Sequence, residues 1–296
     1  MKKAILIICV LSTFLMFSQE NESSNLQNYT PSKLLEKGKI DIKWFNNLYT
    51  ETKTNDKGNT FNIDRQTFFT ASIEIFTGVT QSKKLNAGLI IDFRSNSFAG
   101  QSTTSVFGFR NEAGKSRVGI AHVAPSIKFA PFKNLSNFSV QSSFFIPLHD
   151  KESDENGYLA EKSFIFQNRF FYDYTFESRK FQLFCELNSR FFFGEKPIKD
   201  GSFNPKGGYA NNSLELTPGV FLSYFASNKF TVLGFAQQAV LIDLGNKYSK
   251  EYTAAGLGAK YQVTNVINLE TLYSRFIRGN DTGLGQSFNF GLRAIF

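Results

Sequence analysis

In several segments of this chain, ionisable side chains lie two or four residues apart while the alternate positions are apolar. Asp92 and Arg94 are two residues apart, and Glu186 and Arg190 are four apart. Residues with this spacing point to the same side of an extended chain. Charges gathered on one face can form ion pairs, or can line a water-filled space whose ion preference they set. We assign fifteen residues to such a face as candidates for lining a pore: Asp41, Lys43, Glu74, Asp92, Arg94, His122, Lys128, Arg169, Asp173, Glu186, Arg190, Glu215, Lys260, Glu270 and Arg293.

The histidines do not have the spacing of a hydrolytic site. His122 and Ser126 lie on one extended segment, so their Cβ atoms are about 13 Å apart at about 3.3 Å per residue. A nucleophile and its base must be within hydrogen-bond reach of each other. The His-x-Ser-Asn motif of outer-membrane phospholipases is absent. We therefore predict no catalytic residues and no enzymatic activity.

One polar segment has part of the pattern of a calcium loop. Oxygen-bearing residues alternate in 150–157, and Gly157 is sixth when Glu152 is counted as first, but the twelfth position is Ser163 where the loop needs Glu. Removal of an N-terminal signal would take away Cys9 and leave Cys185, which allows neither an internal disulfide nor a thiolate cluster. We predict no metal site and no cofactor.

The elements that must position the polar face are predicted β-strands. At the end of the chain, Phe288, Phe290, Leu292, Ala294 and Phe296 alternate with mostly polar residues, which is typical of a strand with one apolar side. The pattern predicts twelve strands, at about 39–52, 62–80, 85–98, 116–131, 137–148, 163–176, 180–193, 213–225, 229–242, 252–263, 265–278 and 287–296. It is ambiguous in the ninth of these strands, where the inward and outward faces cannot be told apart. In the fourth strand, Pro125 indicates a bulge.

Short and long links alternate between these strands. The longer, Gly-bearing or charged links lie near 53–60, 99–115, 149–162, 194–212, 244–251 and 279–283. A barrel of the outer membrane with both termini in the periplasm has this alternation and an even number of strands. A soluble β-sandwich also has period-2 strands, but its strands need not be about 12 to 16 residues long. We predict an all-β, transmembrane, antiparallel up-and-down β-barrel of about twelve strands, with both termini periplasmic, over residues 39–296.

Composition supports this class of protein. The chain has 35 Phe and 11 Tyr with a mean hydropathy of −0.22, which is expected when lipid-facing and water-facing side chains alternate. Two lysines precede the apolar segment 4–17 and Ser18, so residues 1–18 are a predicted secretory signal cleaved near Ser18. Residues 19–38 are polar and aperiodic, and are a predicted periplasmic arm. The net charge is +8 without a basic block, so we interpret the charge as scattered and expect no nucleic-acid partner.

The chain resembles outer-membrane β-barrels of Gram-negative bacteria in its signal, its strand rhythm and its terminal Phe296. In such proteins the aromatic last strand is read by the barrel-assembly machinery. The abundance of Phe, Asn and Lys, and the signal ending Phe17-Ser18-Gln19, resemble Bacteroidota proteins. Residues 124–132 and 139–148 are faintly similar to a hairpin of transporter-like barrels of the phenol-degradation (MetA-pathway) type, and no functional residue carries over from this hairpin.

These observations lead to three hypotheses for function. The first is a passive, porin-like channel or transporter for small solutes in the outer membrane. The second is a structural or assembly scaffold that transports nothing, and the third is a lipid-modifying enzyme. The lumen of a twelve-stranded barrel is either a narrow, partly plugged pore or a space filled by a network of side chains. The expected partners are outer-membrane lipid and, during biogenesis, the assembly machinery.

Overall fold

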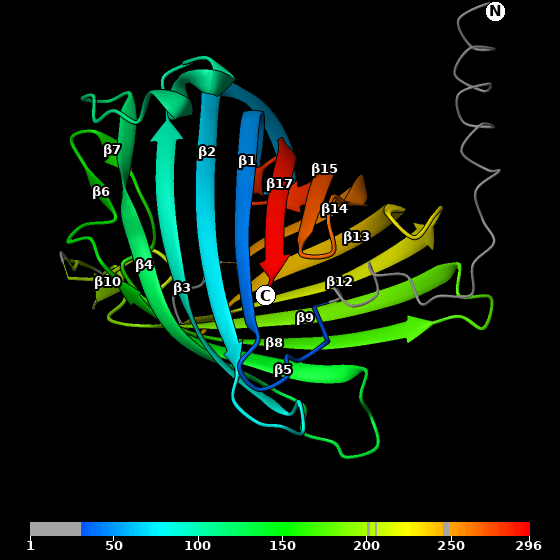
Figure 1. Ribbon diagram of the computed structural model, residues 1–296. Helices are drawn as coiled ribbons and strands as arrows, with labels where there is room; N and C mark the ends of the chain where they lie inside the picture. The colour runs from blue at the N-terminus through cyan, green and yellow to red at the C-terminus, as the bar shows by residue number, and fades with distance from the viewer. Residues whose placement is uncertain (1–30, 200–201, 205, 245–248) are drawn as a thin grey trace, which may run out of the picture.

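The computed structural model describes residues 31–199, 202–204, 206–244 and 249–296. Over these residues the chain forms a closed antiparallel β-barrel of twelve long strands (Figure 1). The predicted signal segment 1–18 and residues 19–30 of the predicted arm lie outside the described residues. The strands are β1 (Ile40–Asp56), β2 (Asn59–Gly78), β3 (Leu85–Ser97), β4 (Ser116–Phe129), β5 (Phe138–Pro147), β8 (Phe164–Thr175), β9 (Phe181–Phe193), β12 (Ser213–Phe225), β13 (Phe230–Asp243), β14 (Ser249–Gln262), β15 (Ile267–Asn280) and β17 (Gln286–Ile295).

Each long strand pairs with its neighbours in chain order, and the first strand closes on the last. β1 pairs with β17 from Asp41 opposite Ile295 to Thr50 opposite Gln286. The other edge of β1 pairs with β2. Because every barrel strand has two partners, the described sheet has no free edge along its wall. The predicted twelve-stranded antiparallel barrel is confirmed.

The two ends of the barrel differ in their connections. We call the end that holds residues 31–39 and Phe296 the terminal end, and its turns are short: 79–84, 130–137, 176–180, 226–229 and 263–266. We call the opposite end the loop end. Its longer links carry the small elements η2 (Thr103–Gly108), β6 (Ser153–Asp154), β7 (Gly157–Tyr158), β10 (Ile198–Lys199), β11 (Ser202–Phe203) and β16 (Thr282–Gly283).

The prediction of a long link at 53–60 is wrong. β1 and β2 continue through this segment and leave only a two-residue turn at Lys57 and Gly58, whose φ angles are 48° and 83°. Such a turn matches the right-handed twist of a hairpin. β15 likewise extends to Asn280, and β16 adds a further pairing to β1. The sequence does not reveal these extensions because both faces are largely polar there, so the apolar stripe stops before the strand does.

The fourth strand contains a bulge, but at a different residue from the predicted one. The register between β3 and β4 shifts between Asp92 and Phe93, opposite Ala121, whereas Pro125 pairs in register with Leu89. The bulge leaves the Ala121 carbonyl free to accept a hydrogen bond from the Leu148 amide at 2.9 Å. It therefore directs the start of the link after β5.

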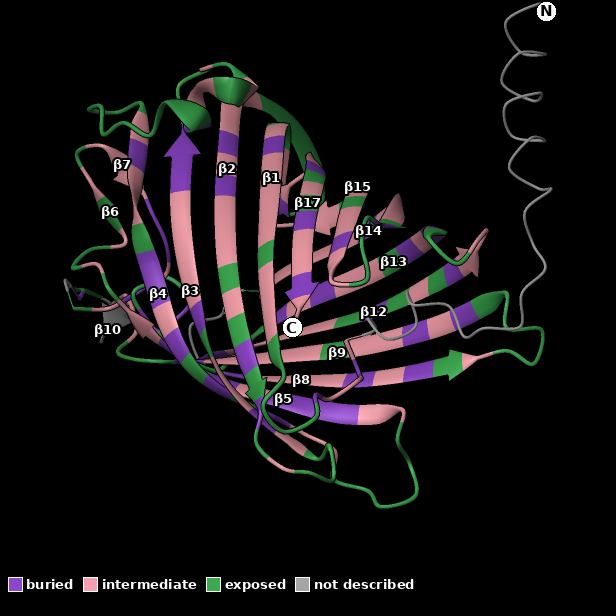
Figure 2. Cartoon of the chain, viewed as in Figure 1, coloured by how far each residue is buried: buried purple, intermediate pink, exposed green. Residues whose placement is uncertain are grey.

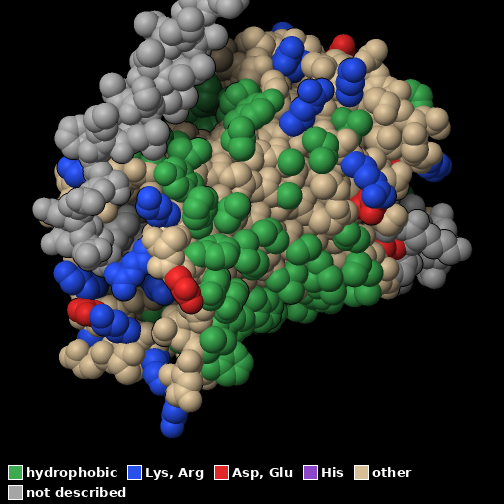
Figure 3. Space-filling view, turned by 90° about the vertical axis from the view of Figure 1, so that its right-hand side faces the viewer, with side chains coloured by type: hydrophobic (Ala, Val, Ile, Leu, Met, Phe, Trp, Pro, Cys, Tyr) green, Lys and Arg blue, Asp and Glu red, His purple; other side chains and the backbone are tan. Residues whose placement is uncertain are grey.

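The outer wall of the barrel is apolar. Large side chains such as Leu89, Phe166 and Val220 point outward and are about 40–50% exposed, whereas inward residues of the same strands are more covered (Figure 2). Figure 3 shows hydrophobic side chains forming a broad continuous area on one side of the molecule, with Lys and Arg side chains beside it. Among the described residues no helix is long and apolar enough to cross a bilayer.

The structure decides the phase of β13. Val232 and Ile242 are exposed on the outer wall, whereas Leu233 and Phe235 are buried and face inward. Both faces of this strand are therefore apolar along part of its length, which is why its alternation was ambiguous. The inner wall of the barrel is not uniformly polar.

Candidate functional site

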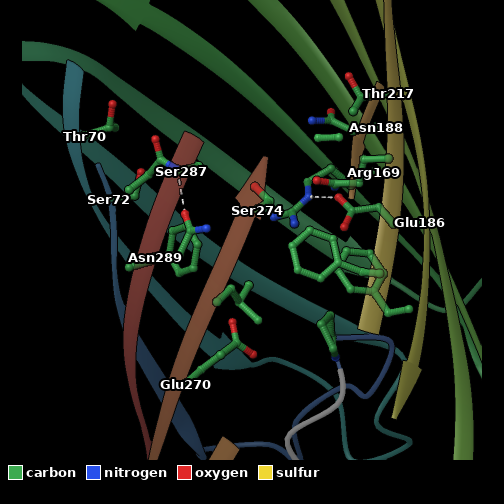
Figure 4. Close-up of a pocket in the computed structure, with 18 of the residues that line it drawn as sticks. Thr70, Ser72, Arg169, Glu186, Asn188, Thr217, Glu270, Ser274, Ser287 and Asn289 are labelled. Atoms are coloured by element: carbon green, nitrogen blue, oxygen red, sulfur yellow. Dashed lines mark hydrogen bonds and ion pairs between the residues drawn. The ribbon is translucent and has the colours of Figure 1, made fainter. Parts of the chain in front are cut away.

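The lumen of the barrel contains a cavity of about 600 Å³. In Figure 4, polar side chains of β2 and β17 (Thr70, Ser72, Ser287, Asn289) point into this cavity toward side chains of β8 and β9. Ten of the fifteen candidate residues line it: Lys43, Glu74, Asp92, Arg94, Arg169, Glu186, Arg190, Glu215, Lys260 and Glu270. Since they come from eight strands, their convergence follows from closure of the barrel.

Most of the lining charges are held in ion pairs. Arg190 lies directly opposite Glu215 on the neighbouring strand, with a closest approach of 3.3 Å. Lys260 lies directly opposite Glu270, at 2.8 Å. These pairs lie along the wall and leave space at the centre of the lumen.

Arg169 makes a different kind of contact. Its Nε donates to Glu186 Oε1 on the neighbouring strand at 2.7 Å (Figure 4). Its Nη1 also lies 3.8 Å from Glu74 Oε1. β2 and β8 are separated by three strands in the sheet, so this second contact reaches across the lumen. Arg169 therefore links two walls and narrows the passage between them.

The charges on the inner wall balance. Apart from His122, the fifteen candidates comprise seven basic and seven acidic residues. Because most of them are paired within about 4 Å, the field of each cation is largely cancelled near its partner. The lumen consequently has no excess of either sign to attract an ion.

Two of the other five candidates, Lys128 and Asp173, hold the described part of the arm against the inner wall at the terminal end. Lys128 Nζ donates to the carbonyl oxygens of Pro31 and Lys33, the latter at 3.0 Å. Asp173 accepts from Ser32 Oγ, and its Oδ2 lies 3.6 Å from Lys33 Nζ. At the same end, Arg293 pairs with Asp41 at 2.6 Å across the closure of the barrel.

The arm is further fixed by its backbone. The Leu35 amide donates to Asn86 Oδ1 at 3.2 Å, and the Gly38 amide donates to the Gly78 carbonyl at 3.1 Å. Ser32 is fully buried and Pro31 lines the cavity. The described end of the arm therefore restricts the lumen at the terminal end.

The fifth candidate outside the cavity, His122, anchors a loop. Its Nε2 lies 3.0 Å from the Glu161 carbonyl oxygen. His149 contacts the carbonyl oxygens of Ala121 at 3.1 Å and Ala160 at 3.0 Å. Leu159 and Ala160 pack with Ala121 in a buried cluster. Both histidines therefore hold the link after β5 against the inner wall at the loop end.

The Glu161 side chain on this loop faces the charged lining of the lumen. It lies 3.5 Å from Arg94. Burial of the Glu161 carboxyl raises its pKa, but the guanidinium groups of Arg94 and Arg190 outweigh this effect and hold the pKa at about 2. The loop is therefore fastened by a carboxylate that remains charged at ordinary pH.

The carboxylates of the suspected calcium loop are used in holding loops together. Glu152 accepts hydrogen bonds from the amides of Lys162 at 3.0 Å and Tyr209 at 2.9 Å. Asp154 lies 3.1 Å from Arg117. Among the described residues, no three His, Cys, Asp or Glu side chains are arranged to hold a metal ion.

An aromatic wall inside the lumen is the main feature that the sequence did not reveal. Phe171, Phe184, Phe221 and Phe235 come from four successive barrel strands, and their ring centroids are 6.0, 5.5 and 5.2 Å apart in that order. Arg169 lies 5.0 Å above the Phe171 ring. The wall could have been found by parity, because Phe221 and Phe235 are in phase with the polar residues Ser223 and Gln237.

No protein-family model matches the chain, and no curated protein is similar to it in sequence. The fold is similar to solved structures. An outer membrane channel from Pseudomonas putida F1 superposes with a TM-score of 0.70 at 10% identity, over 90% of this chain and 98% of that one. The beta domain of the Bordetella autotransporter BrkA superposes with a TM-score of 0.57 at 11% identity, over 87% and 100% of the respective chains. These likenesses show a shared barrel fold.

Proposed function

We propose that the protein is a passive outer-membrane channel for small solutes. The observation that carries this proposal is a cavity lined by charged and polar side chains, enclosed by a barrel whose outer wall is apolar. An apolar exterior is stable in lipid, and a hydrated interior gives a polar solute a path through it. In this proposal the short turns and both termini face the periplasm, as in barrels of this topology.

The inner wall indicates which solutes would pass. Its balanced ion pairs present both donors and acceptors without net charge, and its aromatic wall offers apolar contact. A cavity of about 600 Å³ has the size of a small-molecule site. We expect uncharged or zwitterionic small molecules with an apolar part to be favoured over simple ions.

The two contacts at the ends of the lumen set the rate of passage. The arm is held by Lys128 and Asp173 at one end, and the loop that carries Glu161 is held at the other. We expect a small conductance that rises when either contact is loosened. Lys128→Met, which leaves the Pro31 and Lys33 carbonyl oxygens without their cation, tests the terminal end.

The experiment is a planar-bilayer measurement on the purified full-length chain, combined with liposome swelling. The expected result is a small, steady conductance whose reversal potential in a KCl gradient is near zero, and faster swelling with zwitterionic than with anionic solutes. Lys151→Gln, on an exposed loop residue, serves as the control. A folded barrel that conducts in neither the wild type nor Lys128→Met refutes the channel.

A second function, a scaffold without transport, is favoured by one observation. The buried contacts of the arm with Lys128, Asp173 and Asn86 resemble a fixed closure more than a path. A sealed barrel in both proteins of the conductance experiment would support this function. The two histidines are hydrogen-bonded to backbone carbonyls of the loop and its neighbouring strand, which supports a structural rather than a catalytic role for them.

A further inference from the structure

The positive charge of the chain is concentrated at the terminal end of the barrel. Five lysines lie on the arm and on the turns after β2 and β4: Lys37, Lys39, Lys83, Lys84 and Lys133. Three further basic residues, Arg179, Lys180 and Lys229, lie on the turns after β8 and β12. All eight are exposed. The turns and arm of this end contain only two acidic residues, Glu36 and Glu177, among those described.

The rest of the described barrel is close to neutral. The charged candidates on the inner wall are seven basic and seven acidic residues, and the links of the loop end have nearly equal numbers of the two kinds. The net charge of +8, which includes two lysines of the predicted signal, therefore has its main source in the short turns. The chain is polarised along the barrel axis.

The basic residues form two sectors on the rim. In the first, the Ala130 amide donates to the Lys84 carbonyl at 3.1 Å, which joins the turns after β2 and β4. In the second, the Phe225 amide donates to the Lys180 carbonyl at 2.8 Å, which joins the turns after β8 and β12. Of the eight side chains, Lys83 alone has an ion pair with a described residue, Glu36. The other seven cations are available to an external anion.

Exposed apolar side chains lie among these cations. Val79, Phe132 and Leu135 on the first sector, and Phe176 on the second, are 37–54% exposed. They continue the apolar outer wall to the turns that carry these cations. Aromatic residues beside lysines are typical of the level at which lipid headgroups meet acyl chains.

We propose that this basic rim binds the phosphate groups of anionic phospholipids in the leaflet around the terminal end. The inference rests on the membrane placement in the proposed function, but does not require conduction. Each exposed lysine is a compact charge suited to a phosphate, and the apolar neighbour holds the acyl chain beside it. Cations spread over two sectors, each next to the apolar wall, fit lipids that surround the barrel better than a single acidic protein.

The test measures which lipids remain bound to the full-length protein. The wild type is reconstituted in phosphatidylcholine nanodiscs that contain a minor fraction of phosphatidylglycerol, then extracted, and the retained lipids are quantified by mass spectrometry. A lysine near an anionic surface contributes about a fivefold preference. We expect wild-type protein to be enriched in phosphatidylglycerol, and a variant with Lys37→Gln, Lys39→Gln, Lys84→Gln and Lys133→Gln to lose at least about tenfold of this enrichment.

The matched control removes the same charge from the loop end. Its substitutions are Lys57→Gln, Lys151→Gln, Lys162→Gln and Lys206→Gln, all at exposed residues, and it should retain wild-type enrichment. Equal loss in both variants overturns the inference, because net charge alone would then explain the binding. If the first variant fails to fold, Arg179→Gln with Lys180→Gln and Lys229→Gln tests the second sector, where unchanged enrichment overturns the inference.

Two further measurements separate the possible sources of the effect. Inorganic phosphate should displace the lipid no better than chloride of the same ionic strength, and selective displacement would show a site for free phosphate instead. Conductance is recorded on the same protein preparations in planar bilayers. A conducting wild type without phosphatidylglycerol preference overturns this inference and leaves the channel intact. Preference without conductance in either the wild type or Lys128→Met supports the inference and refutes the channel.

Discussion

Arg169→Gln is the substitution that tests the lumen most directly, because Arg169 joins two walls. Its guanidinium contacts Glu186 at 2.7 Å and Glu74 at 3.8 Å, and these side chains are only 11–22% exposed. Replacement by Gln leaves both carboxylates without this cation. It also gives the balanced inner wall a net negative charge.

The expected loss of stability follows from this geometry. Breaking a fully buried pair costs about 3–5 kcal/mol, and one hydrogen bond to a charged group contributes about 1.5–3 kcal/mol. The partial exposure of the pair places the loss at the lower end, at about 2 kcal/mol. The control is Lys115→Gln, because Lys115 pairs with Glu112 at a similar 2.6 Å but both side chains are about half exposed. That pair should contribute less than about 1 kcal/mol.

The assay is a double-mutant cycle with Arg169→Gln and Glu186→Gln, using urea unfolding in lipid vesicles and the reversal potential in a KCl gradient. The coupling energy should be about 1–2 kcal/mol, within the range for residues in contact. Arg169→Gln should also shift the reversal potential toward cation selectivity, and the double variant should partly restore it. A coupling energy below about 0.5 kcal/mol together with an unmoved reversal potential would refute the role assigned to this residue.

Three further predictions concern the outer wall, the arm and the loop. Leu89→Arg places a charge on the lipid-facing wall and should cost about 2–4 kcal/mol near the bilayer midplane, whereas Asn188→Arg, in the cavity, should cost less; equal losses in urea unfolding would contradict the assignment of faces. Lys128→Met should expose the arm to limited proteolysis while the barrel remains resistant, and an arm that stays protected would show that Lys128 does not hold it. The pKa of Glu161, about 2, is below its unfolded value of about 4.3, so its stabilisation of the loop is complete above the unfolded value and is lost as the pH falls through about 2. The protection of the loop amides against hydrogen exchange, relative to the intrinsic rate at each pH, should therefore be constant between neutral pH and about pH 5 and fall only in stronger acid. Glu161→Gln should abolish this response, and a fall in protection already at mild acidity would mean that another group holds the loop.

The strands could be predicted from the sequence because each faces two different solvents. Outside the lipid-facing region this signal ends, so the extensions of β1 and β2 to Lys57 and Gly58 were predicted to be a loop. It also fails where both faces are apolar, as at Leu233 and Phe235 in β13. Alternation thus reports the environment of a strand and not its length.

The candidate site also depends on contacts that a local sequence pattern cannot reveal. Parity placed the charged residues on one face, but which carboxylate meets Arg169 depends on barrel closure, which no local pattern contains. The charge was interpreted as scattered because Lys84, Lys133 and Lys180 are roughly fifty residues apart in the chain. Up-and-down topology returns the chain to the same end after every two strands, so separated turns gather into one basic rim.

The pairing of β1 with β17 has a consequence for how the protein is made. Asp41 and Arg293 meet although 252 residues separate them. β17, which completes the sheet, follows all the other barrel strands in the chain, so the sheet cannot close before those strands have been made. Contacts this distant in sequence form slowly, because the entropy of the intervening chain must be lost first. Until then the growing sheet has two open edges that can pair with other chains, and a chain that ends before Gln286 has no means of closing them.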